Sequence, residues 1–329
     1  MRILAAPDKF KGSIDALEAA AAIATGAAGF ARTQSMPVAD GGEGTLAALG
    51  GANRTTLVSG PLGDAVEARW RLARNVAVIE MAEAAGLTLV GGAAGNDALS
   101  AATTGVGELI AEAAASGARR IIVGVGGSAT TDGGLGAIRA MEPLVRFRGV
   151  KIEVACDVRL KFLEAARVFG PQKGASSAEI EFLSRRLVRL AEIYQEEFGV
   201  EVEDLVSSGA AGGLAGGLAA VGADLIEGFE LVSEEIGLAE AIEGVDLVVT
   251  GEGCLDDQSF AGKAVGGVVE LAEESGTPVL IVAGQIADVP DDLAERGVST
   301  VAISDVCGID RAFEDPAGCI AEVVRAHLA

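Results

Sequence analysis

Residues 121–134 read IIVGVGGSATTDGG, an apolar run that ends abruptly in glycines, hydroxyl side chains and one carboxylate. The apolar residues predict a buried β-strand. The glycines after it let the backbone turn and bring its N–H groups close to an anionic ligand. Ser128, Thr130, Thr131 and Asp132 supply oxygen atoms for a substrate or a metal ion. The alternative is a glycine-rich turn that merely closes a buried strand, but the pattern recurs along the chain, and this favours an anion site.

Strand-like and helix-like runs alternate on both sides of this stretch. Apolar, strand-like runs cover residues 3–6, 152–156, 246–250 and 279–283. An alanine-rich helix is expected over residues 13–28, with Ser13 as its N-cap, and a charged amphipathic helix over residues 176–198. The alternation predicts an α/β fold with a largely parallel sheet, in which ligands bind beyond the carboxyl ends of the strands.

The length of the chain, 329 residues, predicts two lobes rather than one. Residues 61–79 alternate like a β-hairpin around the only tryptophan, Trp70, and indicate the start of a second lobe. Because no proline-rich linker is present, we expect one domain to be inserted in the other. We predict a discontinuous domain of residues 1–57 and 243–329, an inserted α/β domain of residues 58–242, and an active site in the cleft between them.

The charge and hydropathy of the chain exclude several classes of partner. A net charge of −23 argues against DNA or RNA, which bind basic surfaces. The apolar runs are too short to cross a bilayer, and the N-terminus lacks the apolar stretch of a signal peptide. We therefore expect a cytoplasmic protein that binds neither nucleic acid nor membrane. A homodimer is compatible with the sequence.

Histidine and cysteine usage narrows the chemistry. The single histidine, His327, lies close to the C-terminus, so Ser-His-Asp, Cys-His and His-ligated metal catalysis are all disfavoured. The four cysteines form no C-x-x-C pair and are expected to be reduced and mostly buried. Catalysis is left to carboxylates, lysines, hydroxyls, backbone amides and a hard cation.

Five segments join glycine to charged residues at predicted loops: residues 7–12, 40–45, 124–134, 170–174 and 251–263. Together they offer backbone amides, lysines for phosphate oxygens, and carboxylates for Mg²⁺ or for a proton, which are the components of phosphoryl transfer. The sequence does not match the standard nucleotide-binding motifs. Gly262-Lys263 is not followed by a hydroxyl residue as in a P-loop, and the spacing after Gly126 does not match G-x-G-x-x-G.

The same segments resemble the glycerate kinase family of the bacterial, two-domain type, in the same order along nearly the whole chain. The resemblance implies a kinase that uses ATP and Mg²⁺ to phosphorylate glycerate, usually at the 2-hydroxyl, with a Rossmann-like (flavodoxin-like) domain and an inserted α/β domain around the site. The matching segments are APDKFKGS (6–13), PVADGGEGT (37–45), IVGVGGSATTDGG (122–134), ACDV (155–158), VFGPQKGA (168–175), GAAGGL (209–214) and VTGEGCLDDQSFAGKA (249–264).

Three features depart from that family's usual pattern. The stretch 140–156 is shorter, Cys254 stands where an arginine is common, and VRLKFLEAARVF (158–169) replaces an Asn-Pro-Leu run with further glycines. The alternatives are therefore a kinase of a related small hydroxy acid and a catalytically impaired binding protein. A nucleotide-binding oxidoreductase is disfavoured because G-x-G-x-x-G is missing. The product, 2- or 3-phosphoglycerate, is left open.

The candidate catalytic residues are Asp8, Lys9, Asp40, Asp132 and Asp157. Asp40 or Asp132 is expected to accept the proton of the attacking hydroxyl, and Asp40 and Glu43 are expected to hold Mg²⁺. Helix-entry or turn-capping acids are the alternatives at Asp8, Asp40 and Glu43.

The candidate phosphate- and nucleotide-binding residues combine loop amides, hydroxyls, lysines and acids. A hydroxyl-rich helix N-cap is the alternative for 128–132, and an exposed loop lysine is the alternative for Lys173. The group comprises Lys11, Gly126, Gly127, Ser128, Thr130, Lys173, Glu252, Asp256 and Lys263.

Overall fold

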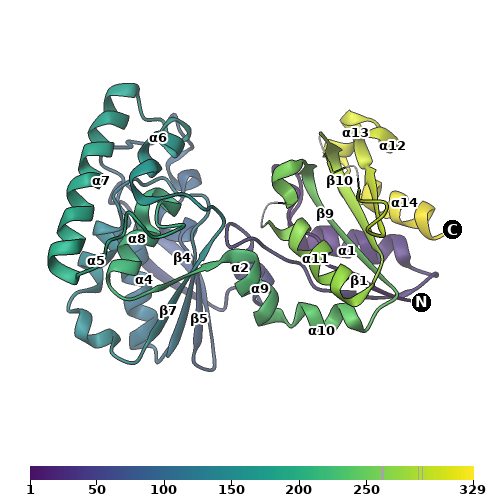
Figure 1. Cartoon of the computed structure of the whole chain (residues 1–329), viewed down its shortest axis with the longest axis horizontal. Helices are drawn as coiled ribbons and strands as arrows, with labels where there is room; N and C mark the ends of the chain where they lie inside the picture. Colours follow the sequence, from purple (N-terminus) through teal and green to yellow (C-terminus); the bar gives the residue numbers. More distant parts are fainter. Residues whose placement is uncertain (261–262, 288, 291) are drawn as a thin grey trace. The chain divides into compact units, whose positions relative to one another are not determined.

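The computed structural model describes residues 1–260, 263–287, 289–290 and 292–329. The chain divides into two compact units, which are described separately (Figure 1). Unit 1 comprises Met1–Asp40, Ala47–Leu49 and Phe229–Ala329, and unit 2 comprises Gly41–Leu46 and Gly50–Gly228.

The bounds of the two units differ from the predicted 57/58 and 242/243, for two reasons. The strand Arg54–Ser59 pairs with the sheet of unit 2, so the first bound lies earlier in the chain than predicted. The helix Leu238–Glu243 buries Leu238 and Ile242 in the core of unit 1, so the second bound also lies earlier in the chain than predicted.

Unit 1 is a parallel five-stranded sheet in the order β11-β10-β9-β1-β2. When the five strands of this unit are numbered 1 to 5 along the chain, their order across the sheet, read from β2, is 2-1-3-4-5. This is the flavodoxin-like arrangement. The strands are β1 (Arg2–Ala5), β2 (Arg32–Ser35), β9 (Leu247–Leu255), β10 (Val279–Ile286) and β11 (Val298–Ala302).

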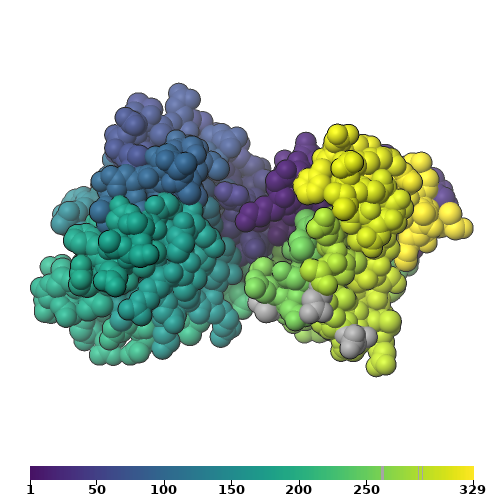
Figure 2. Space-filling view, turned by 90° about the horizontal axis from the view of Figure 1, so that it is seen from above, coloured from purple at the N-terminus to yellow at the C-terminus, as the bar shows by residue number. Residues whose placement is uncertain are grey.

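Helices cover both faces of the unit 1 sheet because successive strand residues point to opposite sides. Ile3 and Ala5 pack with α1 and α14, whereas Leu4 and Ala6 pack with α10 and α11. Figure 2 shows the N-terminal (purple) and C-terminal (yellow) segments side by side in unit 1. The helices are α1 (Ala16–Ala27), α9 (Gly228–Ile236), α10 (Leu238–Glu243), α11 (Ala264–Ser275), α12 (Ile303–Cys307), α13 (Ile309–Glu314), α14 (Pro316–Leu328) and the 3₁₀ helix η6 (Asp257–Phe260).

The N-cap of α1 is Asp15 rather than the predicted Ser13. The Asp15 carboxylate accepts a hydrogen bond from Glu18 N (2.8 Å), and the Glu18 carboxylate accepts one from Asp15 N (3.1 Å). This reciprocal pair is a capping box, which Ser13 cannot form because Ala16 stands three residues after it. Ser13 instead donates its backbone N–H to Phe10 O in the preceding turn.

Unit 2 is a six-stranded sheet in the order β3-β4-β5-β6-β7-β8. β4 is antiparallel to both of its neighbours, β3 and β5, which confirms the hairpin predicted around Trp70. β5 to β8 are parallel. The strands are β3 (Arg54–Ser59), β4 (Ala65–Ala73), β5 (Val76–Glu80), β6 (Arg120–Gly124), β7 (Lys151–Cys156) and β8 (Asp224–Glu227).

Two apolar clusters hold the helices of unit 2. One face of the sheet packs on α4, α5 and α8. The amphipathic helix predicted over 176–198 is confirmed as α7, with a capping box at Ser176 and Glu179, and it buries Leu183, Leu187 and Leu190. The helices are α3 (Ala82–Ala85), α4 (Thr104–Ala115), α5 (Leu135–Met141), α6 (Ala165–Phe169), α7 (Ser177–Phe198) and α8 (Leu214–Ala220), with α2 (Thr45–Ala48) shared between units; η1 to η5 are Leu87–Val90, Leu144–Phe147, Phe162–Glu164, Pro171–Lys173 and Ala210–Gly213.

The predicted α/β fold with parallel sheets is confirmed. Within the part of the chain that the structure describes, no helix is long and apolar enough to cross a membrane.

Candidate functional site

Two of the predicted glycine-rich segments interlock in unit 2. Val125, just after β6, donates its N–H to Gly41 O (3.0 Å). A Cβ on Gly126 would lie 2.5 Å from Gly42 Cα, and a Cβ on Gly41, whose φ is +91°, would lie 2.8 Å from Ala155 O. Glycine is therefore required at these positions for the backbones to approach so closely. The approach places residues 41–45 at the carboxyl ends of β6 and β7.

Glu80, which the sequence analysis missed, anchors this crossing segment. It ends β5, and its Oε1 accepts hydrogen bonds from Gly44 N (2.9 Å) and Leu46 N (2.6 Å). Burial raises the pKa of Glu80, while these two N–H donors oppose the rise. A charged residue directly after an apolar strand-like run was the available signal, as it was at Asp157.

The exposed part of the glycine loop lies at 126–128. Gly127 is exposed and Ser128 half-buried, and the loop is held from one side by Leu87 N, which donates to Gly127 O (2.9 Å). A Cβ on Gly127 would lie 2.5 Å from Glu43 Oε1, so the Glu43 carboxylate lies against this loop. Thr130, by contrast, is fully buried, and its hydroxyl has no hydrogen-bond partner.

Asp132 is buried beneath the loop, 1% exposed, and its carboxylate already accepts four hydrogen bonds. Oδ2 accepts from Thr103 N (2.9 Å), Thr103 Oγ1 (2.9 Å) and Gly136 N (3.1 Å), and Oδ1 accepts from Gly134 N (3.1 Å). With these oxygens engaged, Asp132 fixes the starts of α4 and α5. Its geometry favours a scaffolding role over proton acceptance.

Lys173 is also buried beneath the loop, whereas the alternative weighed from sequence was an exposed lysine. Its Nζ donates to Thr130 O (2.6 Å), and burial lowers its pKa to about 7 against the opposing effect of Asp132. Asn96, a second residue that the sequence analysis missed, donates to Lys173 O (2.8 Å) and Ala129 O (3.0 Å). Both side chains support the loop from inside unit 2.

Asp157 follows β7 directly and is half-buried, as expected of a residue at the carboxyl end of a strand. Its charge adds to the burial that raises the pKa of Cys156 to about 12. The neighbouring Ala155 O is the atom approached by Gly41. Asp157 therefore lies at the same end of the sheet as the crossing segment.

In unit 1, Asp8, Lys9 and Asp40 form a compact charged group. Lys9 Nζ lies 3.7 Å from Asp8 Oδ1 and 3.6 Å from Asp40 Oδ1, and the backbone N–H of Lys9 donates to Asp8 Oδ1 (2.7 Å). The backbone N–H of Asp8 donates to Gly251 O (2.9 Å). The group thus stands where β1 and β9 adjoin, the point at which the strand order reverses and α/β sheets bind ligands.

Burial and neighbouring carboxylates raise the pKa of two acids here, Asp8 and Glu252. Burial raises the pKa of Asp8 to about 7, Lys9 opposes the rise, and the charges of Asp40 and Glu252 add to it. Burial likewise raises the pKa of Glu252, whose Oε1 is buried without a hydrogen-bond partner. Such a cluster of acids attracts a cation.

The remaining candidates of unit 1 surround Glu252. Lys263 precedes α11, and its positive charge lowers the pKa of Glu252. The negative charge of Asp256 raises the same pKa. Asp256 Oδ1 accepts from Ser259 N (3.1 Å), so it caps η6. Lys11 is exposed, and its backbone N would lie 3.0 Å from a Cβ on Gly253. Residues 261–262 of the predicted loop 251–263 lie outside the described residues.

The donor set around Asp8 fits Mg²⁺, which usually takes one or two carboxylates and completes its shell with water and phosphate oxygens. Asp8, Asp40 and Glu252 supply such oxygens, and Glu252 Oε1 is unpartnered. Among the described residues, no three acidic, cysteine or histidine side chains are arranged to hold a metal ion by themselves. Asp40 and Glu43, the predicted pair of ligands, fall in different units.

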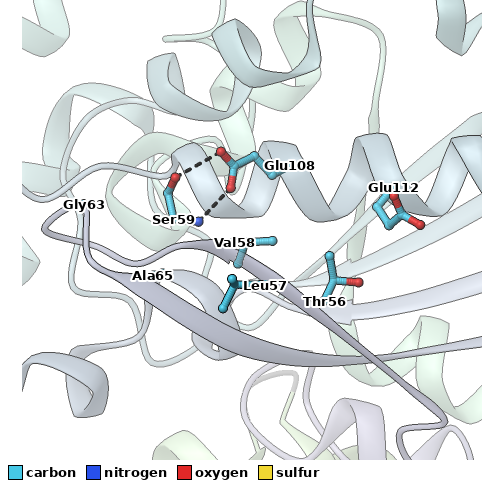
Figure 3. A pocket seen from close by; sticks show the side chains of 8 residues that line it. All are labelled: Thr56, Leu57, Val58, Ser59, Gly63, Ala65, Glu108 and Glu112. Carbon is cyan, nitrogen blue, oxygen red and sulfur yellow. Dashed lines mark hydrogen bonds between the residues drawn. The ribbon is translucent and has the colours of Figure 1, made fainter.

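Among the described residues, unit 2 carries two cavities that bear on the site. One, of about 420 Å³, lies beside β3 and α4, where Glu108 accepts hydrogen bonds from Ser59 N (2.7 Å) and Ser59 Oγ (3.0 Å) (Figure 3). None of the eight residues lining it is a predicted site residue. The other, of about 470 Å³, is lined by Asp132, Arg139 and Arg186 among others. Residues of α4, α5 and α7 line it, so it lies beside the helix starts that Asp132 fixes.

Comparisons with known proteins extend over both units. A profile described as the glycerate kinase family matches residues 3–144 and 141–328. The chain is 39% identical to the glycerate 2-kinase of Escherichia coli K12, over 95% of this chain and 93% of that protein. It is 38% identical to the glycerate kinase of Halalkalibacterium halodurans, over 98% and 96%. A crystal structure assigned to glycerate kinase 2 of Salmonella typhimurium LT2 matches with a TM-score of 0.81 at 34% identity, over 100% of this chain and 97% of that one.

Proposed function

Because this chain belongs to the glycerate kinase family, we propose that it transfers the γ-phosphoryl group of ATP to the 2-hydroxyl of glycerate, with Mg²⁺ as cofactor. The observation that carries the mechanism is the group of Asp8, Lys9 and Asp40 where β1 and β9 adjoin. It combines a cation for an anionic substrate with carboxylates for its hydroxyl proton.

Proton acceptance is assigned to the Asp8–Asp40 pair. A base is most effective when its pKa lies near the working pH, and the pKa of Asp8 is raised to about 7. Lys9, between the two carboxylates, would hold the carboxylate of glycerate. Asp132 is the weaker candidate because its oxygens accept four hydrogen bonds from the protein.

Charge on the transferring phosphoryl group would be offset from both units. Gly127 is exposed and Gly126 and Ser128 are half-buried, so this loop would offer backbone amides and a hydroxyl at the carboxyl end of β6. Lys11 and Lys263 offer cations in unit 1. Lys173, Thr130 and Asp132 would support the glycine loop from inside unit 2.

Mg²⁺ would be held by Asp40 and Glu252, with Glu43 and Asp157 as the candidates from unit 2. When bound, it would supply positive charge to the phosphate oxygens. The protein's own contribution is then positioning and a fixed electrostatic environment, from which most kinase acceleration comes.

The test is product analysis. Incubation with ATP, Mg²⁺ and D-glycerate should give 2-phosphoglycerate, identified by phosphorus NMR, and 3-phosphoglycerate would redirect the assignment of the acceptor hydroxyl. The absence of product from either enantiomer would refute the proposal in favour of a binding protein or of a kinase for a related hydroxy acid.

The site assignment has a matched pair of variants. Asp40→Asn should lower kcat by about 10²-fold or more, the contribution expected of a general base. Asp257→Asn, at an exposed residue of the same charge in η6, should leave kcat unchanged. Equal activity of both variants would remove Asp40 from the mechanism.

A further inference from the structure

Two of the four cysteines lie together in unit 1, although no short sequence motif links them. Cys307 ends α12 and Cys319 lies in the first turns of α14, with their thiols within hydrogen-bonding reach of each other. Cys319 is 0% exposed in the apolar core, and Cys307 packs against the same cluster while remaining partly exposed. The two thiols are thus in contact, but only one of them can be reached from solvent.

The surroundings set the order in which the two sulfurs would react. Burial raises the pKa of Cys319 to about 12, so this thiol stays protonated at neutral pH. The Arg311 guanidinium on α13 lies near both sulfurs, and its hydrogen bond to Glu322 (2.8 Å) is the main cause of its raised pKa. Cys307 is the accessible thiol of the pair, so it is the sulfur that an oxidant from solvent reaches first.

We propose that Cys307 and Cys319 form a peroxide-sensitive thiol pair that closes to a disulfide between α12 and α14. Hydrogen peroxide transfers one oxygen to the Cys307 sulfur, giving a sulfenic acid and one water molecule. The Cys319 sulfur then forms the S–S bond and displaces the second water molecule. Overall the two thiols lose two electrons and two protons, and one peroxide is reduced to two waters.

Contact between the thiols compensates for the low reactivity of Cys319. A sulfur held against the sulfenic acid needs no diffusional encounter, so its small thiolate fraction is offset by a high effective concentration. The other two cysteines are placed differently. Cys254 is exposed on β9, and Cys156 is buried at the end of β7 in unit 2. They serve as internal controls for exposure and for burial.

The experiment uses the folded, full-length protein and detects the bond directly. After exposure to hydrogen peroxide, remaining thiols are blocked with N-ethylmaleimide under denaturing conditions, and the protein is digested with trypsin. Because Arg311 separates the cysteines, they fall in peptides 297–311 and 312–325. The expected product is these two peptides joined, about 2 Da lighter than their sum and separated by dithiothreitol.

Variants distinguish the steps without relying on kinase activity. In Cys319→Ser, the Cys307 sulfenic acid should accumulate and be trapped by dimedone. In Cys307→Ser, Cys319 should remain an alkylatable thiol. The proposal is overturned if Cys307 proceeds to sulfinic acid while Cys319 stays reduced in the parent protein. It is equally overturned if Cys254 is oxidised and Cys307 is not, or if the cross-links join other cysteines.

Discussion

Substitution of Asp132 by asparagine separates a scaffolding role from a catalytic one. The change keeps the side-chain shape but replaces one acceptor oxygen by an NH₂ group. If the asparagine oxygen takes the position of Oδ2, its NH₂ faces Gly134 N, which is itself a donor 3.1 Å from Oδ1. If the group is flipped, the NH₂ faces Thr103 N and Gly136 N instead. Every orientation leaves at least one buried donor without an acceptor.

The magnitude follows from these contacts. A hydrogen bond to a charged acceptor contributes about 1.5–3 kcal/mol, and a buried unsatisfied donor costs about 1–3 kcal/mol. With one bond lost outright and the others weakened by removal of the charge, we expect Asp132→Asn to lower the free energy of unfolding by about 3 kcal/mol. A general base would instead contribute about 10²–10⁴-fold to kcat.

The assay is urea unfolding of both proteins, followed by a change in fluorescence and in circular dichroism, together with kcat measured on the folded variant. We expect a large loss of stability and a fall in kcat of less than about tenfold. Thr103→Val provides the control, because it removes one donor to the same oxygen. In a double-mutant cycle, the two substitutions should be non-additive.

The opposite pattern would refute the reasoning. If Asp132→Asn leaves the free energy of unfolding within about 0.5 kcal/mol of the parent while kcat falls more than about a hundredfold, the carboxylate acts on substrate. Asp132 would then return to the position of proton acceptor beside Asp40.

Three further predictions concern charged side chains. The folded-state pKa of Asp8 is raised from 3.8 to about 7, so ionisation of Asp8 lowers the free energy of unfolding of the parent as pH rises from 4 to 7. Over this range Asp8→Asn should become more stable relative to the parent in urea unfolding, by up to about 4 kcal/mol. A pH-independent difference between the two proteins would contradict this. The pKa of Lys173 is lowered from 10.5 to about 7 in the folded protein, so between these pH values the unfolded chain binds one more proton. The free energy of unfolding of the parent should therefore rise relative to Lys173→Met as pH increases across that range. A fall instead would count against a buried amine. Glu80→Ala should destabilise the protein by about 2–4 kcal/mol by leaving Gly44 N and Leu46 N without an acceptor, whereas Glu80→Gln should recover most of the loss in thermal unfolding; equal losses would mean that packing rather than hydrogen bonding is responsible.

Much of the fold was predictable because its signals are local. The run 121–124 is confirmed as part of β6, and the helix over 176–198 is confirmed because Ser176 and Glu179 form a capping box and Gly199 ends the helix. The wrong N-cap of α1 was also decidable from sequence, since only Asp15 has a glutamate three residues later. The domain bounds were not decidable, because α10 continues the chain with no change in composition and only its burial against unit 1 assigns it.

The candidate site was predictable as a set of strand ends, but not as a set of roles. Asp8 follows β1 and Asp157 follows β7, whereas Glu252 lies within β9, just beyond its apolar run. The charged end of an apolar run was also the available signal for Glu80. What sequence does not contain is where the N–H groups of other segments point. Asp132 is followed by two glycines and a helix, and the amides of that turn close on its own carboxylate. Asp8 is followed by Lys9 and stays beside other acids.

The contrast between Asp132 and Asp8 extends to the buried polar groups of the two units. In unit 2, the buried Lys173 and Asp132 hold a glycine loop in which Gly127 is exposed. Backbone amides of such a loop suit a phosphate but accept no proton. Unit 1 leaves carboxylates close together, with raised pKa values and a buried oxygen of Glu252 unsatisfied. Such an arrangement costs folding stability, and a bound cation or proton would relieve the part of this cost that Lys9 leaves. The charged group at the junction of β1 and β9 is therefore the part of the molecule whose structure is best explained by a ligand.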